Sequence, residues 1–437
     1  MKNQKRKILH YIKLLDEVRY SGERPVEGIA FCRAGYKKGN TPPPPSAFEP
    51  YIPGSDWGSG NDSHAWFHFT FRKPADMKGK PCELVVRTDH DGWGPVNPQF
   101  MVFADGKMRQ GIDMNHQFYR IDDEDEHDIY LYGYTGPRIP SVGLFLSARA
   151  LEEDIDGLCY DISVPADMLS YLPEYSSEYA NIILHLDHAL SLLDMFELGS
   201  TSFHASVARA RAYMREEFYG KYCKQQPMTT VCIGHTHIDC AWRWTLDQTR
   251  EKVQRSFATA LELMKRYPEY RFMSSQALLY KYLKEEDPAL YAEIGERIRE
   301  GRWECEGSMW VEADCNLSSG ESLVRQIVYG KRFFEKEFGV KQRILWLPDV
   351  FGYSAALPQI LRKSGVDWFV TSKISWNDTN QMPNDTFSWQ GIDGTRINTY
   401  FLTAQKKTPA GPVRYTTYVG NPTVSEIAGT WDRYRTV

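Results

Sequence analysis

A histidine and an aspartate two residues apart, His237 and Asp239, directly follow a short apolar run that ends at Gly234. In an extended chain this spacing places both side chains on one face. An imidazole nitrogen and a carboxylate oxygen together suit zinc or a similar divalent ion. Alternatively, His235 and His237 are loop residues bonded to the backbone, and Asp239 caps the next helix. The position at a strand end, followed by Trp242, keeps both interpretations open.

A second acidic residue, Asp349, occupies an equivalent position after the apolar run "RILWLP". A Gly-containing turn and a predicted helix follow it. The carboxyl ends of parallel strands meet at one edge of a sheet, where the active sites of α/β proteins are built. Asp349 could therefore face His237 and Asp239 across the top of the sheet. The alternative role is that of a helix N-cap, for which Ser354 is better placed.

Two further polar loops follow predicted strands and could contact a substrate. In "ECEGSMWVEADCNLSSGES", Glu306 and Glu312 could accept hydrogen bonds from hydroxyl groups beside Trp310. The alternative is that these carboxylates are simply solvated. In "TSKISWNDTN", the cationic side chain of Lys373 indicates a second substrate-binding loop.

The elements that would position these residues alternate between strand and helix after residue 228. Apolar residues three and four apart predict helices over 245–266, 276–299 (one or two helices), 320–338 and 355–364. Short apolar strands lie between them, at 231–234 and in "RFMSS", "RWECEG", "RILWLP" and "DWFVTS". This alternation predicts a parallel sheet, either open or closed into a barrel.

The first half of the chain has a different organisation. Residues 1–24 contain an amphipathic helix, and 25–164 are rich in short alternating strands with regular turn signals, which predicts a β-sandwich domain. Residues 165–227 have helical periodicity and form a predicted helical linker. The α/β segment then occupies 228–437.

Composition narrows the class of protein. The 437 residues carry a net charge of -5 without a basic cluster outside the extreme N-terminus, which disfavours a nucleic-acid partner. The sequence contains no run of 18 apolar residues, so no membrane span is predicted. The basic N-terminus lacks the apolar centre of a signal peptide. Eight cysteines without a Cys-x-x-Cys pair predict reduced thiols and a cytoplasmic location.

Four segments together resemble a known family. "GHTHIDCAWRWTLDQTREKVQRSF", "EGSMWVEADCNLSSGESLVRQ", "WLPDVFGYSAALPQIL" and "FSWQGIDGTR" are similar, in order and spacing, to glycoside hydrolase family 38 α-mannosidases of the cytosolic-type branch. The resemblance covers most of 228–405, and 25–220 resemble the N-terminal β-sandwich and helical linker of that branch.

The resemblance implies a retaining α-mannosidase built on a (β/α)7-type barrel with one zinc ion. His237 and Asp239 match two metal ligands, and Asp349 matches the nucleophile, which also contacts the metal. Three positions match or lie near substrate contacts: Trp242 beneath the mannose ring, Phe351 in the wall of the site and Lys373 near a basic contact. A retaining glycosidase needs two carboxyl groups about 5–5.5 Å apart, one as nucleophile and one as acid.

The sequence departs from the family pattern in two ways. The family has a fourth zinc ligand, a histidine downstream of the nucleophile, whereas no histidine follows His237 here. The Gly-rich segment that carries the family's acid/base aspartate is also absent. We therefore expect an incomplete barrel that resembles the N-terminal portion of a longer enzyme. Alone, such a chain would bind zinc weakly, be nearly inactive and tend to associate, with a homo-oligomer as one outcome.

Other functions stay open at this point. The chain could be a hydrolase of mannosyl-glycerate or of phosphorylated mannosides, for which Lys373 would supply the cation. It could be a non-catalytic carbohydrate-binding fragment. A zinc deacetylase would also fit the pair His237 and Asp239, although nothing around Asp349 favours it. The resemblance to family 38 α-mannosidases predicts α-mannoside oligosaccharides as substrates and neither nucleic acid nor membrane as partners.

Overall fold

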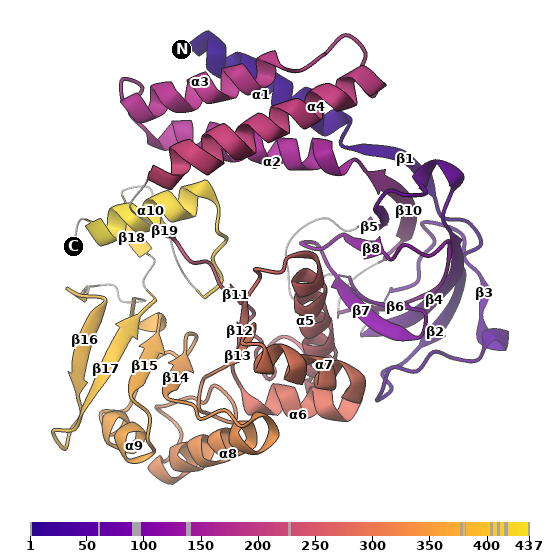
Figure 1. Ribbon diagram of the computed structural model, residues 1–437. Helices are drawn as coiled ribbons and strands as arrows, with labels where there is room; N and C mark the ends of the chain where they lie inside the picture. Colours follow the sequence, from indigo (N-terminus) through magenta and orange to yellow (C-terminus); the bar gives the residue numbers. More distant parts are fainter. Residues whose placement is uncertain are drawn as a thin grey trace. The chain divides into compact units, whose positions relative to one another are not determined.

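The computed structural model describes residues 2–59, 62–89, 98–136, 141–225, 229–375, 379–380, 382–402, 405–408, 411–414 and 418–435. The chain divides into two compact units (Figure 1). The first comprises Met1–Ala34, Pro43–Lys107 and Ile112–Val231, and the second comprises Gly35–Pro42, Met108–Gly111 and Cys232–Val437.

Two antiparallel sheets dominate the first unit. One has the order β1-β10-β5-β8, formed by Tyr20–Pro25, Leu144–Leu151, Cys82–Thr88 and Phe118–Ile121. The other has the order β3-β2-β4-β9-β6-β7, formed by Glu49–Pro50, Ala30–Ala34, Ser63–Arg72, Glu126–Thr135, Gln99–Ala104 and Lys107–Ile112. Of β7, only the two end residues, Lys107 and Ile112, are assigned to this unit. Alternate residues of β4, Phe67, Phe69 and Phe71, share one apolar cluster with Leu84 and Val86 of β5. The two sheets therefore face each other across a common core.

Four helices form a second apolar cluster in this unit: α1 Lys2–Glu17, α2 Glu153–Met168, α3 Ser177–Ser191 and α4 Thr201–Tyr213, which continues as a π-helix over Met214–Tyr222. Helical structure begins at Glu153, earlier than the change expected at 165. Pro165 lies inside α2 and cannot donate a backbone hydrogen bond to the carbonyl of Asp161. The hydroxyl of Tyr219 donates to that carbonyl at 3.0 Å instead, so the helix continues through the proline.

The second unit has the alternating pattern expected from the sequence. Strands β11 Gly234–His235, β12 Phe272–Ser274 and β13 Trp303–Cys305 are parallel neighbours. Strands β14 Ile344–Leu347, β15 Trp368–Thr371 and β17 Arg396–Phe401 are also parallel, and β16 Thr386–Gln390 runs antiparallel to β17. A parallel bridge joins Gly307, which follows β13, to Leu345 of β14. The first group of parallel strands therefore lies next to the second.

The helices between these strands confirm the predicted periodicity. They are α5 Leu246–Arg266, α6 Ala277–Glu286, α7 Pro288–Arg299, α8 Gly320–Phe338 and α9 Leu357–Lys363. After the last parallel strand come a hairpin of β18 Gln405–Thr408 and β19 Gly411–Arg414, and then helix α10 Val424–Arg435. The side chain of Ser319 accepts a hydrogen bond from the amide of Ser322 and caps α8. Gly339, with φ of 71°, ends α8 in the left-handed conformation that glycine adopts easily.

The prediction of an apolar strand over 231–234 is wrong. Strand β11 contains only Gly234 and His235, and Val231 is 77% exposed. Within the described residues β11 pairs only with β12, so it is an edge strand and its preceding residues have no sheet to pack against.

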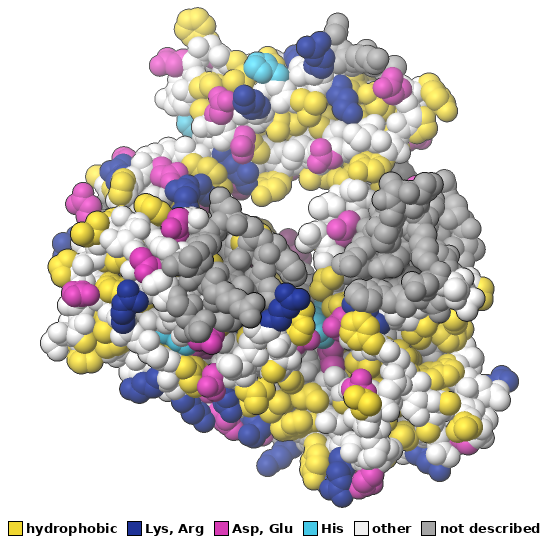
Figure 2. Space-filling view, turned by 180° about the vertical axis from the view of Figure 1, so that it is seen from behind, with side chains coloured by type: hydrophobic (Ala, Val, Ile, Leu, Met, Phe, Trp, Pro, Cys, Tyr) yellow, Lys and Arg dark blue, Asp and Glu magenta, His cyan; other side chains and the backbone are white. Residues whose placement is uncertain are grey.

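No helix in the described part of the chain combines the length and the apolar character that a membrane crossing requires. All eight cysteines are free thiols. Figure 2 shows Lys and Arg side chains interspersed with Asp and Glu side chains over one face of the molecule.

Glu306 connects the end of β13 to the start of β14. Its Oε1 accepts hydrogen bonds from the backbone amides of Arg343, at 2.8 Å, and Ile344, at 3.0 Å. Burial raises the pKa of Glu306 to about 7, although these amides act to lower it. The folded chain therefore retains a proton that the unfolded chain releases between pH 4.5 and 7.

We predict that the free energy of unfolding contributed by Glu306 falls by about 3 kcal/mol as the pH rises from 4.5 to 7. Glu306→Gln keeps the acceptor for both amides and removes the titration. The variant should therefore be more stable than the parent at pH 8 and similar to it at pH 4.5. Urea unfolding at the two pH values checks this, and a variant less stable at pH 8 would contradict it.

Candidate active site

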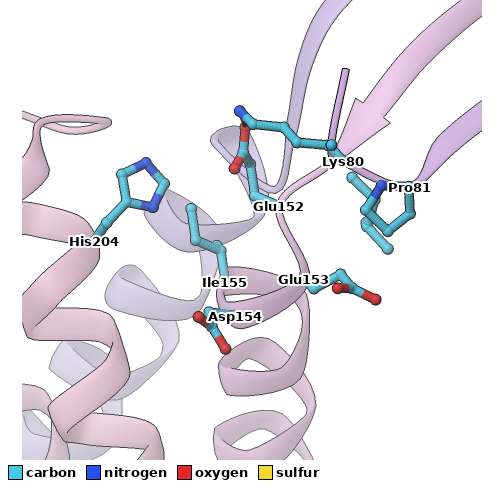
Figure 3. Close-up of a pocket in the computed structure, with 9 residues that line it drawn as sticks. Lys80, Pro81, Glu152, Glu153, Asp154, Ile155 and His204 are labelled. Carbon is cyan, nitrogen blue, oxygen red and sulfur yellow. Dashed lines mark hydrogen bonds and ion pairs between the residues drawn. The ribbon is translucent and has the colours of Figure 1, made fainter. Parts of the chain in front are cut away.

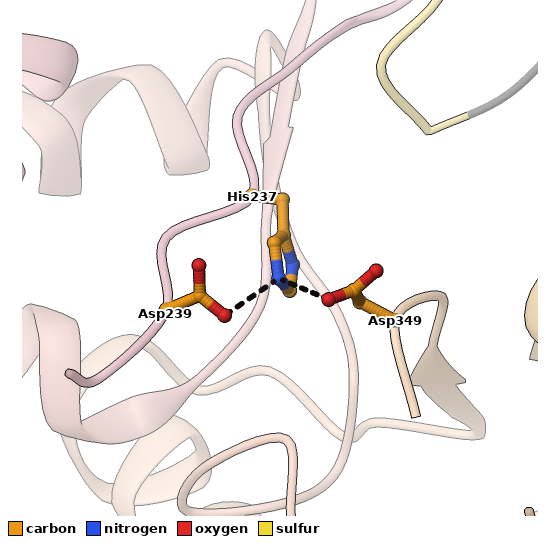
Figure 4. Close-up of side chains that lie close together, drawn as sticks. All are labelled: His237, Asp239 and Asp349. Atoms are coloured by element: carbon orange, nitrogen blue, oxygen red, sulfur yellow. Dashed lines mark ion pairs between the residues drawn. The ribbon is translucent and has the colours of Figure 1, made fainter. Parts of the chain in front are cut away.

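Three side chains from two strand ends converge in the second unit. His237 and Asp239 follow β11, and Asp349 follows β14 (Figure 4). One ligand atom from each lies within 4.8 Å of the others. The Nε2 atom of His237 is 3.5 Å from Oδ1 of Asp239 and 3.6 Å from Oδ2 of Asp349. The sequence-based expectation that Asp349 faces the pair across the sheet is confirmed by these distances.

The two histidines of the motif have different roles. His235 has the backbone contact of the alternative interpretation, since its Nδ1 lies 3.0 Å from the carbonyl oxygen of Met273, but it lies in strand β11 and not in a loop. The ring of His237 points instead at carboxylates. Asp239 is not the cap of the next helix, because the side chain of Thr245 accepts the amide hydrogen of Gln248 there.

The separations of these atoms fit a divalent ion. Two N or O ligands bound tetrahedrally to zinc, each about 2.0–2.2 Å from the ion, lie about 3.3–3.6 Å apart. The two distances from Nε2 of His237 fall within or at the edge of this range. Nε2 is buried and has no well-aligned hydrogen bond within the described residues. A nitrogen that accepts no hydrogen and faces two carboxylates is suited to metal coordination.

The charges around His237 also favour a cation. Burial alone would lower the pKa of its imidazole, but Asp239, Asp349 and Glu312 together raise that pKa to about 12. Three carboxylates around one ring carry more negative charge than a single imidazolium can balance. A divalent cation at Nε2 would neutralise Asp239 and Asp349 while the ring stays neutral.

The second oxygen of Asp349 is held by two donors. The ammonium group of Lys373 lies 2.7 Å from Oδ1, and the hydroxyl of Tyr418 donates to the same oxygen. Burial would raise the pKa of Asp349, but His237, Lys373 and Tyr418 keep it well below its usual range. Lys373 also lies 5.0 Å from the ring centre of Phe351. Asp349 is therefore an ionised carboxylate with a fixed orientation.

Not every predicted substrate contact is part of this cluster. Trp242 is 56% exposed, packs edge-to-face on Trp244 and lies beneath the guanidinium of Arg243. Its role as the floor of a sugar site stays a prediction, as does that of the exposed Phe351. Lys373 lies at the cluster, where it pairs with Asp349, and its role as a substrate contact also stays a prediction.

Glu312 and Tyr418 were missed as members of the cluster. Glu312 is not a solvated loop carboxylate, because its side chain is 6% exposed and its Oε2 lies 3.1 Å from Nδ1 of His237. Trp310, expected beside it as a platform, packs against Phe333 instead. Tyr418 belongs to no motif, and only the fold brings it to Asp349.

Gln276 connects the loops that carry these residues. Its Nε2 donates to the carbonyl of Ile238 at 2.9 Å, and its Oε1 accepts the amide hydrogen of Glu312 at 3.3 Å. The residue is buried and has a φ of 66°, a backbone conformation that residues other than glycine rarely adopt. A residue keeps such a strained backbone conformation only where its contacts with the surrounding structure stabilise it.

We predict that Gln276→Ala lowers the free energy of unfolding by about 1–3 kcal/mol, since the buried carbonyl of Ile238 and the part-buried amide of Glu312 lose their partner. Urea unfolding measures the change. Gln390→Ala, at an exposed glutamine of β16, is the control and should shift stability by less than about 0.5 kcal/mol. Equal midpoints for the two variants would contradict this role of Gln276.

Figure 3 shows a cavity in the first unit. Lys80, Glu152 and His204 are among its lining residues. Glu152 is already engaged by the ammonium of Lys80 at 2.5 Å and by the hydroxyl of Ser21 at 2.6 Å. Its carboxylate is thus occupied by structural contacts, and the cavity belongs to a different unit from His237.

Comparison with known proteins shows which family the second half of the chain resembles. Residues 227–437 match the family model described as the glycosyl hydrolases family 38 N-terminal domain. Alpha-mannosidase G of Dictyostelium discoideum is 46% identical over 187 residues, 43% of this chain and 17% of the relative. Alpha-mannosidase of Saccharomyces cerevisiae is 40% identical over 221 residues, 48% of this chain and 20% of the relative.

Alpha-mannosidase 2C1 of Homo sapiens is 45% identical over 195 residues, which cover 45% of this chain and 18% of the relative. The chain therefore spans a fifth or less of the length of these curated relatives. The resemblance seen in the motifs is confirmed: residues 227–437 carry the N-terminal domain of glycosyl hydrolase family 38.

Proposed function

We propose that this chain carries the nucleophile and metal centre of a zinc-dependent retaining α-mannosidase that acts on terminal α-mannosides of oligosaccharides. The observation that supports this most directly is the convergence of His237, Asp239 and Asp349 within 4.8 Å. The substrate class comes from the three relatives described above, all of which are named alpha-mannosidases.

In this proposal, His237, Asp239 and Asp349 hold the ion. Zinc, when bound, acts as a Lewis acid that orients and polarises the oxygens of a ligand. Three protein ligands leave a coordination position open, as catalytic zinc sites do.

Asp349 has the properties that a glycosidase nucleophile needs. Lys373 and Tyr418 stabilise its negative charge and orient its Oδ1. An oxygen of Asp349 attacks the anomeric carbon, the bond to the leaving oxygen breaks, and water later releases the sugar from the aspartate with net retention. The leaving oxygen must take up a proton during the first step.

The general acid for that step is not assigned to this cluster. Asp239 and Glu312 are the other carboxylates around His237, but both contact its ring. General acid catalysis contributes about 10²–10⁴-fold to such reactions. We propose that this chain alone therefore hydrolyses ordinary α-mannosides very slowly, whereas a substrate with a good leaving group needs no general acid.

The test compares two α-mannosides on the purified 437-residue chain with zinc. We expect turnover of dinitrophenyl α-mannoside, whose leaving group departs without a proton, and little turnover of methyl α-mannoside. Efficient hydrolysis of both would show that an acid is present and would contradict the second part of the proposal. Hydrolysis of neither would contradict the assignment of Asp349 as a working nucleophile.

A mannosyl-glycerate or phosphorylated mannoside is a less suitable substrate. Either would place an anion in the site, and Lys373 was the residue expected to bind it. The ammonium group of Lys373 instead pairs with Asp349.

We further infer that the parallel strands of the second unit belong to a (β/α)7-type barrel, and that the first unit comprises a β-sandwich and a helical linker. The bridge between Gly307 and Leu345, which joins the two groups of parallel strands, supports the first inference. The common core of the two antiparallel sheets supports the second. The eight free cysteines support a cytoplasmic location. A homo-oligomer also remains part of the proposal, and light scattering would test it.

A further inference from the structure

We propose that Glu312 is a positioning residue that holds His237 with its hydrogen on Nδ1, so that Nε2 is free to bind the metal. This inference rests on the proposed metal centre and adds a residue outside the ligand set. Oε2 of Glu312 lies 3.1 Å from Nδ1 of His237, on the side of the ring opposite the contacts of Nε2 with Asp239 and Asp349.

Both side chains of this contact are shielded from water. The side chains of His237 and Glu312 are 11% and 6% exposed. Among the described residues, neither Nδ1 nor Oε2 makes a well-aligned hydrogen bond, and each is buried. An unpaired polar atom in such a place is costly, so the two atoms have each other as the available partner.

The remaining groups of Glu312 are fixed from the neighbouring strand. Its Oε1 accepts the hydroxyl hydrogen of Ser275 at 2.6 Å, and its backbone amide donates to Gln276 at 3.3 Å. Ser275 and Gln276 directly follow β12 and are both buried. A chain of contacts therefore runs from the end of β12 through Glu312 to His237 at the end of β11.

This arrangement determines which ring nitrogen meets the ion. A neutral imidazole carries its hydrogen on only one nitrogen, and a carboxylate near Nδ1 accepts that hydrogen. Nε2 then presents its lone pair toward Asp239 and Asp349. A carboxylate behind a metal-bound histidine also makes the imidazole a stronger ligand, and loss of such a partner costs about 10–100-fold in metal affinity.

The experiment measures zinc affinity by competition with a chelator, without any substrate. The metal-free 437-residue chain is compared with Glu312→Gln and with Glu304→Gln. The control removes the same charge from an exposed residue of β13. We expect Glu312→Gln to bind zinc about 10–100-fold more weakly and Glu304→Gln to bind like the parent.

Two more measurements separate positioning from folding. Ser275→Ala keeps Glu312 and its charge but removes the hydrogen bond to Oε1, so a loss of a few-fold is expected. Cobalt(II) replaces zinc as a spectroscopic probe, and its visible absorption should change in Glu312→Gln because the geometry at His237 changes. A destabilising effect alone, checked by circular dichroism, would not alter the spectrum of the metal-loaded protein.

The outcomes distinguish this inference from the proposal beneath it. If the parent binds zinc and Glu312→Gln binds it within two-fold, with the same cobalt spectrum, then Glu312 has no positioning role, although the metal centre stands. If the parent binds no zinc and His237→Ala changes nothing, both the metal centre and the role of Glu312 are refuted.

Discussion

Replacement of Asp349 by alanine is expected to lower the rate of dinitrophenyl α-mannoside hydrolysis by at least about 10⁴-fold, because removal of a nucleophile eliminates the reaction path. Asp349→Asn should lose as much activity, since the amide keeps the shape but not the charge that Lys373 and Tyr418 stabilise. Initial rates with saturating zinc measure the effect.

The control for this loss is Asp247→Asn, at an exposed aspartate in the first turn of α5. It removes the same charge from the same unit and should leave the rate within two-fold. If Asp349→Ala retained a tenth or more of the parental rate, Asp349 would not be the nucleophile. The same two variants also distinguish an enzyme from a carbohydrate-binding fragment. A binding fragment would bind sugar equally well as Asp349→Ala and as Asp247→Asn.

Metal removal is expected to have the second largest effect. A chelator should abolish hydrolysis, and added zinc should restore it. Binding to the folded state should also stabilise the protein, by about 2.7 kcal/mol when free zinc is 100 times its Kd. Thermal unfolding with and without zinc measures this independently of activity.

His237→Ala is the matching variant, because it removes the ligand that contacts both carboxylates. We expect its zinc affinity to fall by on the order of 10³-fold or more, since even partners behind the ligands contribute 10–100-fold. Its thermal unfolding should no longer respond to zinc. An equal zinc response in parent and variant would place the metal elsewhere.

The strand-and-helix pattern of the second unit could be predicted because its signals are local. Helix α8 has a serine cap at Ser319 and a glycine stop at Gly339, and its apolar residues repeat with helical spacing. The rule that parallel strands end at one edge of a sheet was enough to bring Asp349 opposite His237. These features depend on short stretches of sequence and on general geometry.

Residues whose role depends on tertiary packing could not be predicted. Glu312 looked like a solvated carboxylate in a polar loop, and nothing in the loop indicates that its side chain is buried against His237. Tyr418 reaches Asp349 from 69 residues further along the chain. Helix α2 continues through Pro165, and the carbonyl of Asp161 there accepts a hydrogen bond from the hydroxyl of Tyr219, a partner that cannot be predicted from the sequence around the proline.

The central claim is that Asp349 attacks the anomeric carbon of an α-mannoside at this metal centre. Its most direct test is to incubate the zinc-loaded chain with a fluorinated mannosyl fluoride, which forms a glycosyl-enzyme that hydrolyses slowly, and to map the adduct by mass spectrometry. The account predicts one fluoromannosyl group on the peptide that contains Asp349, formed with zinc and absent after chelation. An adduct on another carboxylate, or none on a chain shown to bind zinc, would contradict it.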